Sequence, residues 1–81
     1  MVDVIYTDKF EDEFKKADKS IKIKAEKQIK KIIESPDVGK PLRYDLKGER
    51  TIYVKSYRII YSYKDNTLYF LRFEHRKGVY D

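Results

Sequence analysis

All five arginines of the sequence lie in its second half, whereas the first half is basic through lysine alone. They are Arg43, Arg50, Arg58, Arg72 and Arg76. A planar guanidinium presents paired N–H donors that match the oxygens of a phosphate group, while a lysine offers a mobile point charge. If the chain binds a phosphodiester, we therefore expect the site in the second half.

Several other chemistries are excluded by residues that the sequence lacks. There is no cysteine, so a disulfide, a thiolate nucleophile and a Cys-ligated metal site are impossible. His75 is the single histidine, which rules out a multi-histidine metal site. Its side chain is still the only one whose ordinary pKa, about 6.5, suits proton transfer near neutral pH. We expect no metal and no cofactor, and we keep His75 as a candidate for proton transfer.

The composition indicates one small, basic domain that spans residues 1–81. Of the 81 residues, 41% are hydrophobic and 41% are charged, which allows a modest core but no large cleft. Nineteen basic residues against 14 acidic ones give a net charge of +5, and such a surface favours polyanions. No apolar run approaches the roughly 20 residues of a membrane span. We expect a soluble, cytoplasmic protein.

Hydrophobic periodicity predicts an α+β fold. Residues 2–6 alternate between apolar and polar side chains, as in a short strand. Two helices follow; Asp8 and Glu11 have the spacing of a capping box at the start of the first, and Pro36 ends the second. Three segments rich in Tyr, Ile, Val and Phe predict further strands, at residues 51–54, 57–63 and 68–73. We expect the N-terminal strand and an antiparallel helix hairpin to pack on one face of a mostly antiparallel sheet of about four strands.

Short turns should fix the register of the last three strands. Lys55-Ser56 is a plausible two-residue turn, and Asp65-Asn66 is a better one because both residues tolerate positive φ. The pairs that result are Val54 with Tyr57 and Tyr63 with Leu68.

The register in turn predicts which side chains share a face of the sheet. The side chains expected to face the helices are those of Ile52, Val54, Ile59, Tyr61, Leu68 and Phe70. Those expected on the opposite, open face are Tyr53, Arg58, Ile60, Ser62, Tyr69, Leu71, Phe73 and His75. A β-bulge in any strand would move the side chains beyond it to the other face of the sheet. An open face that mixes apolar, aromatic and cationic groups is a candidate binding surface.

Three short motifs occur in register with this pattern of elements. They are Ser-Tyr-Arg-Ile-Ile-Tyr at residues 56–61, His-Arg-Lys-Gly-Val-Tyr at residues 75–80, and Pro41-Leu42-Arg43 followed by Leu46-Lys47-Gly48. The first resembles the turn and strand that carry the catalytic arginine of the RelE/ParE superfamily of toxins from type II toxin-antitoxin systems. The second is similar to the C-terminal segment of that family, which ends in a functional tyrosine. The resemblance covers nearly the whole chain and is to short, archaeal-type RelE-like forms.

The resemblance implies both an activity and partners. RelE-type toxins cut messenger RNA in the ribosomal A site, and a cognate antitoxin neutralises them. For this chain the resemblance implies a metal-independent endoribonuclease that inhibits translation, with the ribosome, mRNA and a RelB-like antitoxin as partners. In such cleavage the 2′-hydroxyl of the RNA is the nucleophile. The protein supplies a proton acceptor, positive charge for the phosphorane and a proton donor.

Candidate site residues follow from this chemistry and from the motifs. Arg58 is the first choice for stabilising phosphate charge, and Arg76 is a second clamp. Tyr80 resembles the family tyrosine that stacks on a base or takes part in proton transfer, and His75 is a further catalytic candidate. Candidate RNA contacts are Lys47, Arg50, Tyr53 and Lys55. Candidate antitoxin contacts are the apolar members of the open face, Ile60, Leu71 and Phe73.

The motifs also depart from those of the better-known RelE toxins, and two other functions stay open. Glu74 lies near the place where those toxins have an additional arginine, which leaves the proton acceptor unassigned. A second hypothesis is a ParE-like inhibitor that binds DNA gyrase and does not cleave RNA. A third is a degenerate toxin that only binds its antitoxin. Arg58, Arg76 and Tyr80 together favour the nuclease.

Overall fold

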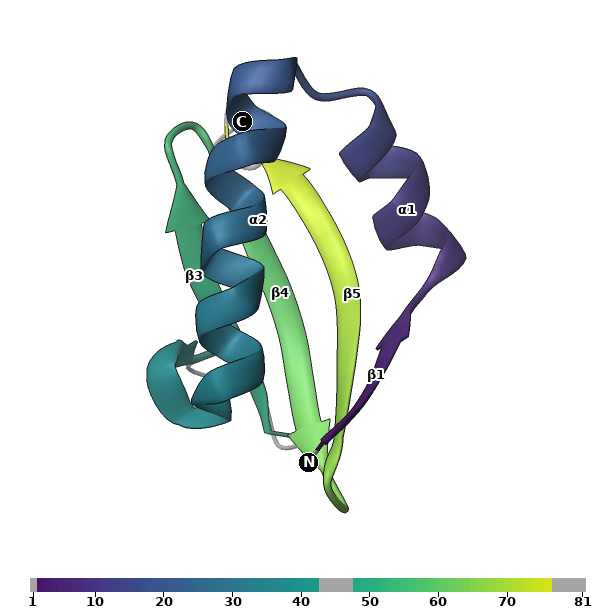
Figure 1. The fold of residues 1–81 in the computed structure, drawn as a ribbon, viewed down its shortest axis with the longest axis vertical. Helices are drawn as coiled ribbons and strands as arrows, with labels where there is room; N and C mark the ends of the chain where they lie inside the picture. Colours follow the sequence, from purple (N-terminus) through teal and green to yellow (C-terminus); the bar gives the residue numbers. More distant parts are fainter. Residues whose placement is uncertain (1, 43–47, 77–81) are drawn as a thin grey trace.

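Two helices cover one face of a five-stranded sheet in the computed structural model, which describes residues 2–42 and 48–76 (Figure 1). Along the chain the elements are β1 (Asp3–Tyr6), α1 (Asp8–Lys15), α2 (Lys19–Glu34), the 3-10 turn η1 (Pro36–Val38), β2 (Lys40–Pro41), β3 (Glu49–Val54), β4 (Tyr57–Lys64) and β5 (Thr67–His75). The predicted α+β fold is confirmed. The sheet has one strand more than expected, because the two-residue β2 pairs with β3.

The sheet joins the first and last strands of the described chain. Its strand order is β1-β5-β4-β3-β2; β1 runs parallel to β5, and all other neighbours are antiparallel. The helices run in opposite directions, with α2 crossing in front of β4 and β3 and α1 lying on the side of β5 (Figure 1). None of the described helices is long and apolar enough to cross a membrane.

Thr7 links the start of α1 to β5. Its hydroxyl oxygen accepts a hydrogen bond from the Phe10 N–H at 3.1 Å, so Thr7 is the N-cap, and the expected cap Asp8 lies inside the first turn. The same hydroxyl lies within donating distance of the carbonyl oxygens of Phe70 (3.2 Å) and Leu71 (3.0 Å). One side chain therefore fixes the helix start against a particular point of the last strand.

The core lies between the helices and the sheet. Ala25, Ile29 and Ile32 recur at helical spacing on the buried face of α2, and Phe10 is the buried residue of α1. The sheet contributes the buried side chains of Val54, Ile59, Tyr61, Leu68, Phe70 and Phe73. Burying an apolar side chain of this size contributes about 1.5–3 kcal/mol to folding, so this layer supplies most of the stability of so small a domain.

Both predicted turns and the register that they set are confirmed. Val54 pairs with Tyr57 and Tyr63 pairs with Leu68. Asp65 and Asn66 have φ angles of 52° and 61°, the left-handed values that a tight hairpin turn requires at both of its central positions. The pairing from β3 across to β4 is regular over the full length of β3.

The register changes once, within β5. Ile60 pairs with Arg72 but Tyr61 pairs with Phe70, so Leu71 is an extra residue in a β-bulge. Beyond the bulge, every side chain of β5 is on the face opposite to the one that an unbroken register predicts.

The prediction that Phe73 and His75 lie on the open face is therefore wrong. Phe73 is 1% exposed and packs against Phe10 and Phe14 under the helices. His75 pairs with Tyr57, whose ring stacks on that of Phe73 and meets His75 edge-on. The bulge instead brings Arg72 and Glu74 to the open face.

The turn that follows α2 is fixed by a buried hydroxyl. Tyr61 donates a hydrogen bond to the Pro36 carbonyl at 2.7 Å and accepts one from the Gly39 N–H at 2.9 Å. A Cβ atom at position 39 would lie 2.7 Å from this hydroxyl, so only glycine fits there without a shift. These contacts set the point from which the chain enters β2 and β3.

We expect Tyr61→Phe to lower the free energy of unfolding by about 1–3 kcal/mol, because it leaves a buried N–H and a carbonyl without their partner. Urea unfolding followed by circular dichroism measures the change. The matched control is Tyr69→Phe on the exposed face of β5, which should change the stability by less than about 0.5 kcal/mol. Equal losses in the two variants would contradict a structural role for the Tyr61 hydroxyl.

Candidate functional site

Arg58 lies on the open face of the sheet, as predicted. Its neighbour Ile59 is fully buried under the helices, and because successive side chains of a strand alternate, Arg58 points away from them. In the sheet it is flanked by Tyr53 of β3 and Glu74 of β5. The Arg58 side chain is 23% exposed, so its guanidinium is partly shielded but reachable from solvent.

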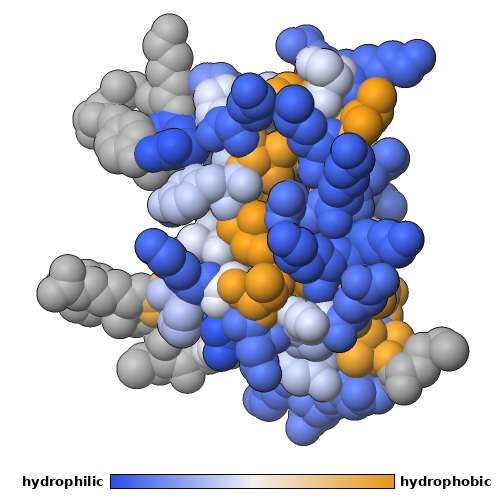
Figure 2. Space-filling view, turned by 60° about the vertical axis from the view of Figure 1, so that its left-hand side comes forward, coloured by the Kyte–Doolittle hydropathy of each residue, from blue (hydrophilic) through white to orange (hydrophobic). Residues whose placement is uncertain are grey.

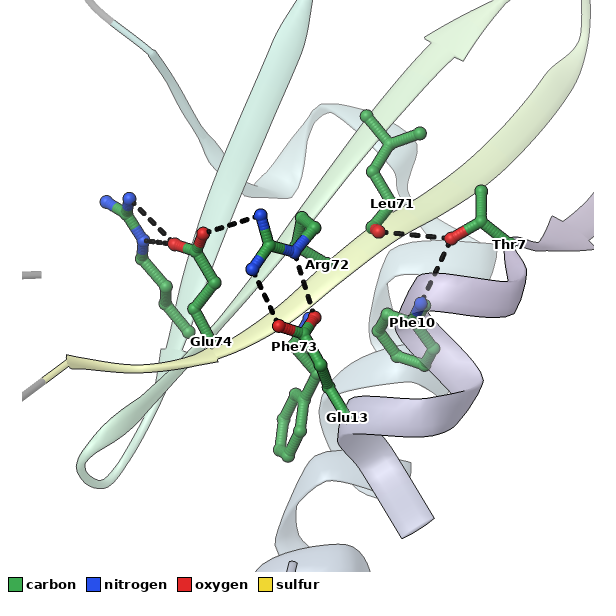
Figure 3. A network of polar contacts seen from close by, with 8 residues as sticks. Thr7, Phe10, Glu13, Leu71, Arg72, Phe73 and Glu74 are labelled. Atoms are coloured by element: carbon green, nitrogen blue, oxygen red, sulfur yellow. Dashed lines mark hydrogen bonds and ion pairs between the residues drawn. The ribbon is translucent and has the colours of Figure 1, made fainter. Parts of the chain in front are cut away.

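The guanidinium of Arg58 is held by the carboxylate of Glu74. Arg58 Nε donates to Glu74 Oε1 at 3.0 Å, and Nη2 lies 2.9 Å from the same oxygen. The other oxygen, Oε2, lies 3.1 Å from Arg72 Nη1. Glu74 therefore bridges two arginines, as Figure 3 shows for Glu74 and Arg72.

A second acidic residue, Glu13 of α1, continues this row of charges. Arg72 Nε and Nη2 donate to the two oxygens of Glu13 at 3.0 and 2.7 Å, and Oε1 also accepts from the Phe73 N–H at 2.9 Å (Figure 3). Burial alone would raise the pKa of Glu13. The hydrogen bonds from Arg72 and Phe73 and the charge of Arg72 outweigh burial, so the pKa lies below its ordinary value. The hydrogen bond with Glu13 likewise raises the pKa of Arg72, so both groups stay charged.

Arg76 and Tyr53 extend the open face past Arg58. The guanidinium carbon of Arg76 lies 4.6 Å from the centre of the Tyr53 ring, within the range of a cation–π contact. The Arg76 N–H donates to the Ser56 carbonyl, which holds the end of β5 against the β3–β4 turn. Tyr53 is 48% exposed and is the partner of Arg58 across β3 and β4. Arg58, Tyr53, Glu74 and Arg76 thus form one continuous surface, here called the Arg58 surface.

The Arg58 surface can bind a phosphate group without a metal. A guanidinium has five N–H donors, and Glu74 takes two of those of Arg58, both on the Nε–Nη2 edge. At the end of the guanidinium, Nη1 and Nη2 each keep an N–H that Glu74 does not use, and this Nη1–Nη2 edge can donate in a fork to two phosphate oxygens. The described residues contain no group of His, Asp and Glu side chains that could hold a metal ion.

Other predicted site residues have different surroundings. Arg50 lies on the helix-facing side beside Tyr61, and its Nη1 donates to the carbonyl oxygens of Gly39 (2.8 Å) and Asp37 (3.2 Å), so it supports the turn after α2. His75 lies on the face opposite to Arg58, and the two are therefore not brought together. Lys47 and Tyr80 fall outside the described residues.

Lys55 lies in the β3–β4 turn with a φ of 57°, next to a lysine-lined hollow that the sequence did not reveal. This hollow, at the edge of β3, has a volume of 240 Å³ and is lined by Lys24, Lys27, Gln28, Tyr53, Val54 and Lys55. Figure 2 shows the side formed by α2 and the β3 edge, where hydrophilic residues surround a strip of apolar ones. Helical spacing groups the lysines on α2, but only the packing of α2 on β3 brings them to Tyr53.

The expected antitoxin contacts are only partly available at the surface. Phe73 is in the core, and Ile60, although on the open face, is only 7% exposed. Leu71, the extra residue of the bulge, is half-buried.

A more apolar hollow, of 410 Å³, lies between the two helices and is lined by Tyr6, Phe10, Glu11, Phe14, Lys15, Glu26 and Ile29.

Comparison with known structures places this fold among toxins of toxin-antitoxin complexes. The RelBE2 toxin-antitoxin complex of Mycobacterium tuberculosis contains a chain 28% identical to this one, with 93% of this chain and 98% of that chain covered and a TM-score of 0.78. A chain of the RelB-RelE complex of Methanococcus jannaschii is 22% identical to this one, with 95% of each chain covered and a TM-score of 0.78. A chain of the intact RelBE complex of Escherichia coli is 15% identical, with 91% of this chain and 95% of that chain covered and a TM-score of 0.80.

Comparison with sequence families is more decisive than these structural likenesses. No curated protein matches the sequence significantly. The sequence model of the ParE toxin of type II toxin-antitoxin systems, parDE, matches residues 4–80, nearly the whole chain. The protein therefore belongs to the ParE toxin family, within the RelE/ParE superfamily, and is a toxin of a type II toxin-antitoxin system.

Proposed function

We propose that this toxin is a metal-independent endoribonuclease that cuts mRNA in the ribosomal A site and so inhibits translation in the cytoplasm. The observation that carries the proposal is the placement of Arg58, whose guanidinium is oriented by Glu74 and keeps one N–H edge for a ligand. Arg76 and Tyr53 adjoin it, so a phosphate and a base could be held side by side.

In the proposed reaction the RNA's own 2′-hydroxyl loses its proton to an acceptor and attacks the adjacent phosphorus. The bond from phosphorus to the 5′-oxygen breaks, the 5′-oxygen takes up a proton, and a 2′,3′-cyclic phosphate is left. As the phosphorane forms, negative charge develops on its oxygens, and the free edge of Arg58 would donate hydrogen bonds to them. Arg76 would supply a second positive charge, and Tyr53 and Lys55 would contact the RNA beside it. Tyr80 stays the candidate for base stacking or proton transfer. His75 is less suited to proton transfer at this point because it lies on the other face of the sheet.

We expect Arg58→Ala to slow mRNA cleavage by about 100- to 1,000-fold, the usual effect of removing one donor from developing negative charge. Arg58→Lys keeps the charge but not the fork, and it should recover only part of the loss. Single-turnover cleavage on programmed ribosomes, read by primer extension, measures these rates. The matched control is Lys64→Ala at the exposed end of β4, which should cleave like the parent. Cleavage by Arg58→Ala at the parent's rate would refute the proposed role.

A second candidate function is inhibition of DNA gyrase, and the ParE family match is the observation that favours it. A gyrase inhibitor has no need of a group that stabilises a phosphorane. In this case we expect the purified toxin to leave ribosome-bound mRNA intact and to block supercoiling by gyrase. The two assays on one preparation separate the functions, and inactivity in both would indicate a toxin that only binds its antitoxin.

We further propose that a RelB-like antitoxin binds and neutralises the chain. The support is that structurally similar RelE chains were solved in complexes with RelB. A partner that binds only the folded toxin stabilises it, so we expect the melting temperature to rise with antitoxin concentration. We expect the same rise for Arg58→Ala, because the expected antitoxin contacts are apolar side chains and not the Arg58 guanidinium. An unchanged melting temperature with the protein encoded beside the toxin would contradict this partner.

A further inference from the structure

We propose that Glu74 is a positioning residue of the toxin, which fixes the guanidinium of Arg58 in its reactive orientation. The inference rests on the proposed function of Arg58 and deepens it. The carboxylate of Glu74 lies within the Arg58 surface and cancels part of the positive charge of that surface. If charge were its only effect, Glu74 would oppose RNA binding, and a positioning role explains why it is there.

The contacts of Glu74 restrict both rotation and translation of the Arg58 side chain. Two N–H groups on one edge of the guanidinium converge on Glu74 Oε1, at 3.0 and 2.9 Å, so the planar group has one preferred orientation. The Glu74 side chain is only 17% exposed and the Arg58 side chain 23% exposed, which weakens competition from water. An arginine held in this way loses little conformational freedom when its other edge meets a phosphate.

The carboxylate is itself fixed from the other side. Glu74 Oε2 lies 3.1 Å from Arg72 Nη1, and Arg72 makes a two-point contact with Glu13 of α1. Glu13 in turn accepts the Phe73 N–H of β5. The four charged side chains therefore form a row from α1 to Arg58, in which each group is held by the next. Figure 3 labels Glu13, Arg72 and Glu74 of this row.

The charge of Glu74 makes a positioning role distinguishable from a merely structural one. Removal of this negative charge makes the Arg58 surface more positive, so binding of a polyanion should not weaken. Loss of orientation should lower the rate of the chemical step, because misplacement by about 1 Å can cost about 100-fold. A positioning role thus predicts that loss of Glu74 slows the cleavage step while the toxin binds RNA as tightly as before or more tightly. General destabilisation would instead lower the fraction of folded toxin and leave the cleavage rate of each folded molecule unchanged.

The first experiment compares Glu74→Gln and Glu74→Ala in single-turnover cleavage on programmed ribosomes at a range of toxin concentrations. We expect the maximal rate to fall by about 10-fold for glutamine, which keeps one acceptor, and by about 100-fold for alanine. The toxin concentration at half-maximal rate should not rise in either variant. Glu34→Gln, at the exposed end of α2, removes the same charge away from the site and should match the parent.

Two outcomes of this experiment would overturn the inference. If Arg58→Ala is inactive but both Glu74 variants cleave at the parent's maximal rate, Arg58 needs no partner to orient it. If the Glu74 variants cleave faster, the carboxylate restrains the toxin and does not position its arginine. Glu13→Gln, one contact further along the row, should lower the maximal rate less than Glu74→Ala does.

A second measurement needs no cleavage, and it separates this inference from the proposed function. The signal of the Arg58 Nε–H in ¹⁵N NMR spectra is assigned by its absence in Arg58→Lys. In the parent this hydrogen should exchange with water at least about 10-fold more slowly than the Nε–H of an unpaired arginine, because it is hydrogen-bonded to Glu74. Slow exchange in a toxin that does not cleave RNA would refute only the proposed function. Exchange as fast as that of free arginine would refute the positioning role even if the toxin is an active nuclease.

Discussion

The extra residue in β5 is the constraint on which the core and the Arg58 surface both depend. Leu71 has no partner in β4, so the side chains after it exchange faces. Phe73 thereby completes the core, and Glu74 arrives beside Arg58. Thr7 contacts the carbonyl oxygens at this bulge from the end of β1. The start of α1, the core and the candidate site are therefore fixed at the same point of the sheet.

The row of charges from Glu13 to Arg58 shows how a small domain can keep an arginine on a sheet face with limited exposure. An isolated ion pair at a surface contributes little, and an unpaired charge in a shielded position is costly. Here two carboxylates and two guanidinium groups alternate, and the contact between Arg72 and Glu13 uses two parallel hydrogen bonds. The row is electrically neutral, so the positive character of this surface comes from residues beyond it, such as Arg76 and Lys55.

The parts of the fold that depend on short-range signals could be predicted from the sequence. The Asp65-Asn66 turn, the helix periodicity and the strand pairs next to the turns follow from local chemistry, and they place Arg58 and Tyr53 correctly. The bulge could not be predicted, because nothing in the residues 68–73 distinguishes a regular strand from one with an extra residue. The same limit explains the errors at Phe73 and His75. Contacts of Glu13 with Arg72 and of Arg50 with the turn after α2 join distant segments, and spacing does not reveal them.

The parallel pairing of β1 with β5 has a consequence for the order in which the domain folds. Asp3 to Tyr6 pair with Thr67 to Phe70, so the first and last strands of the described sheet are sheet neighbours although they lie far apart along the chain. Pairing across so long a stretch of chain is slow to form, because the intervening segment must first be closed into a loop. Arg72 and Glu74 belong to β5 as well, and Arg72 is held by Glu13 of α1, so the row of charges is complete only once this long-range closure has brought α1 to β5. The candidate site is thus complete only after the first and last strands of the described sheet have met.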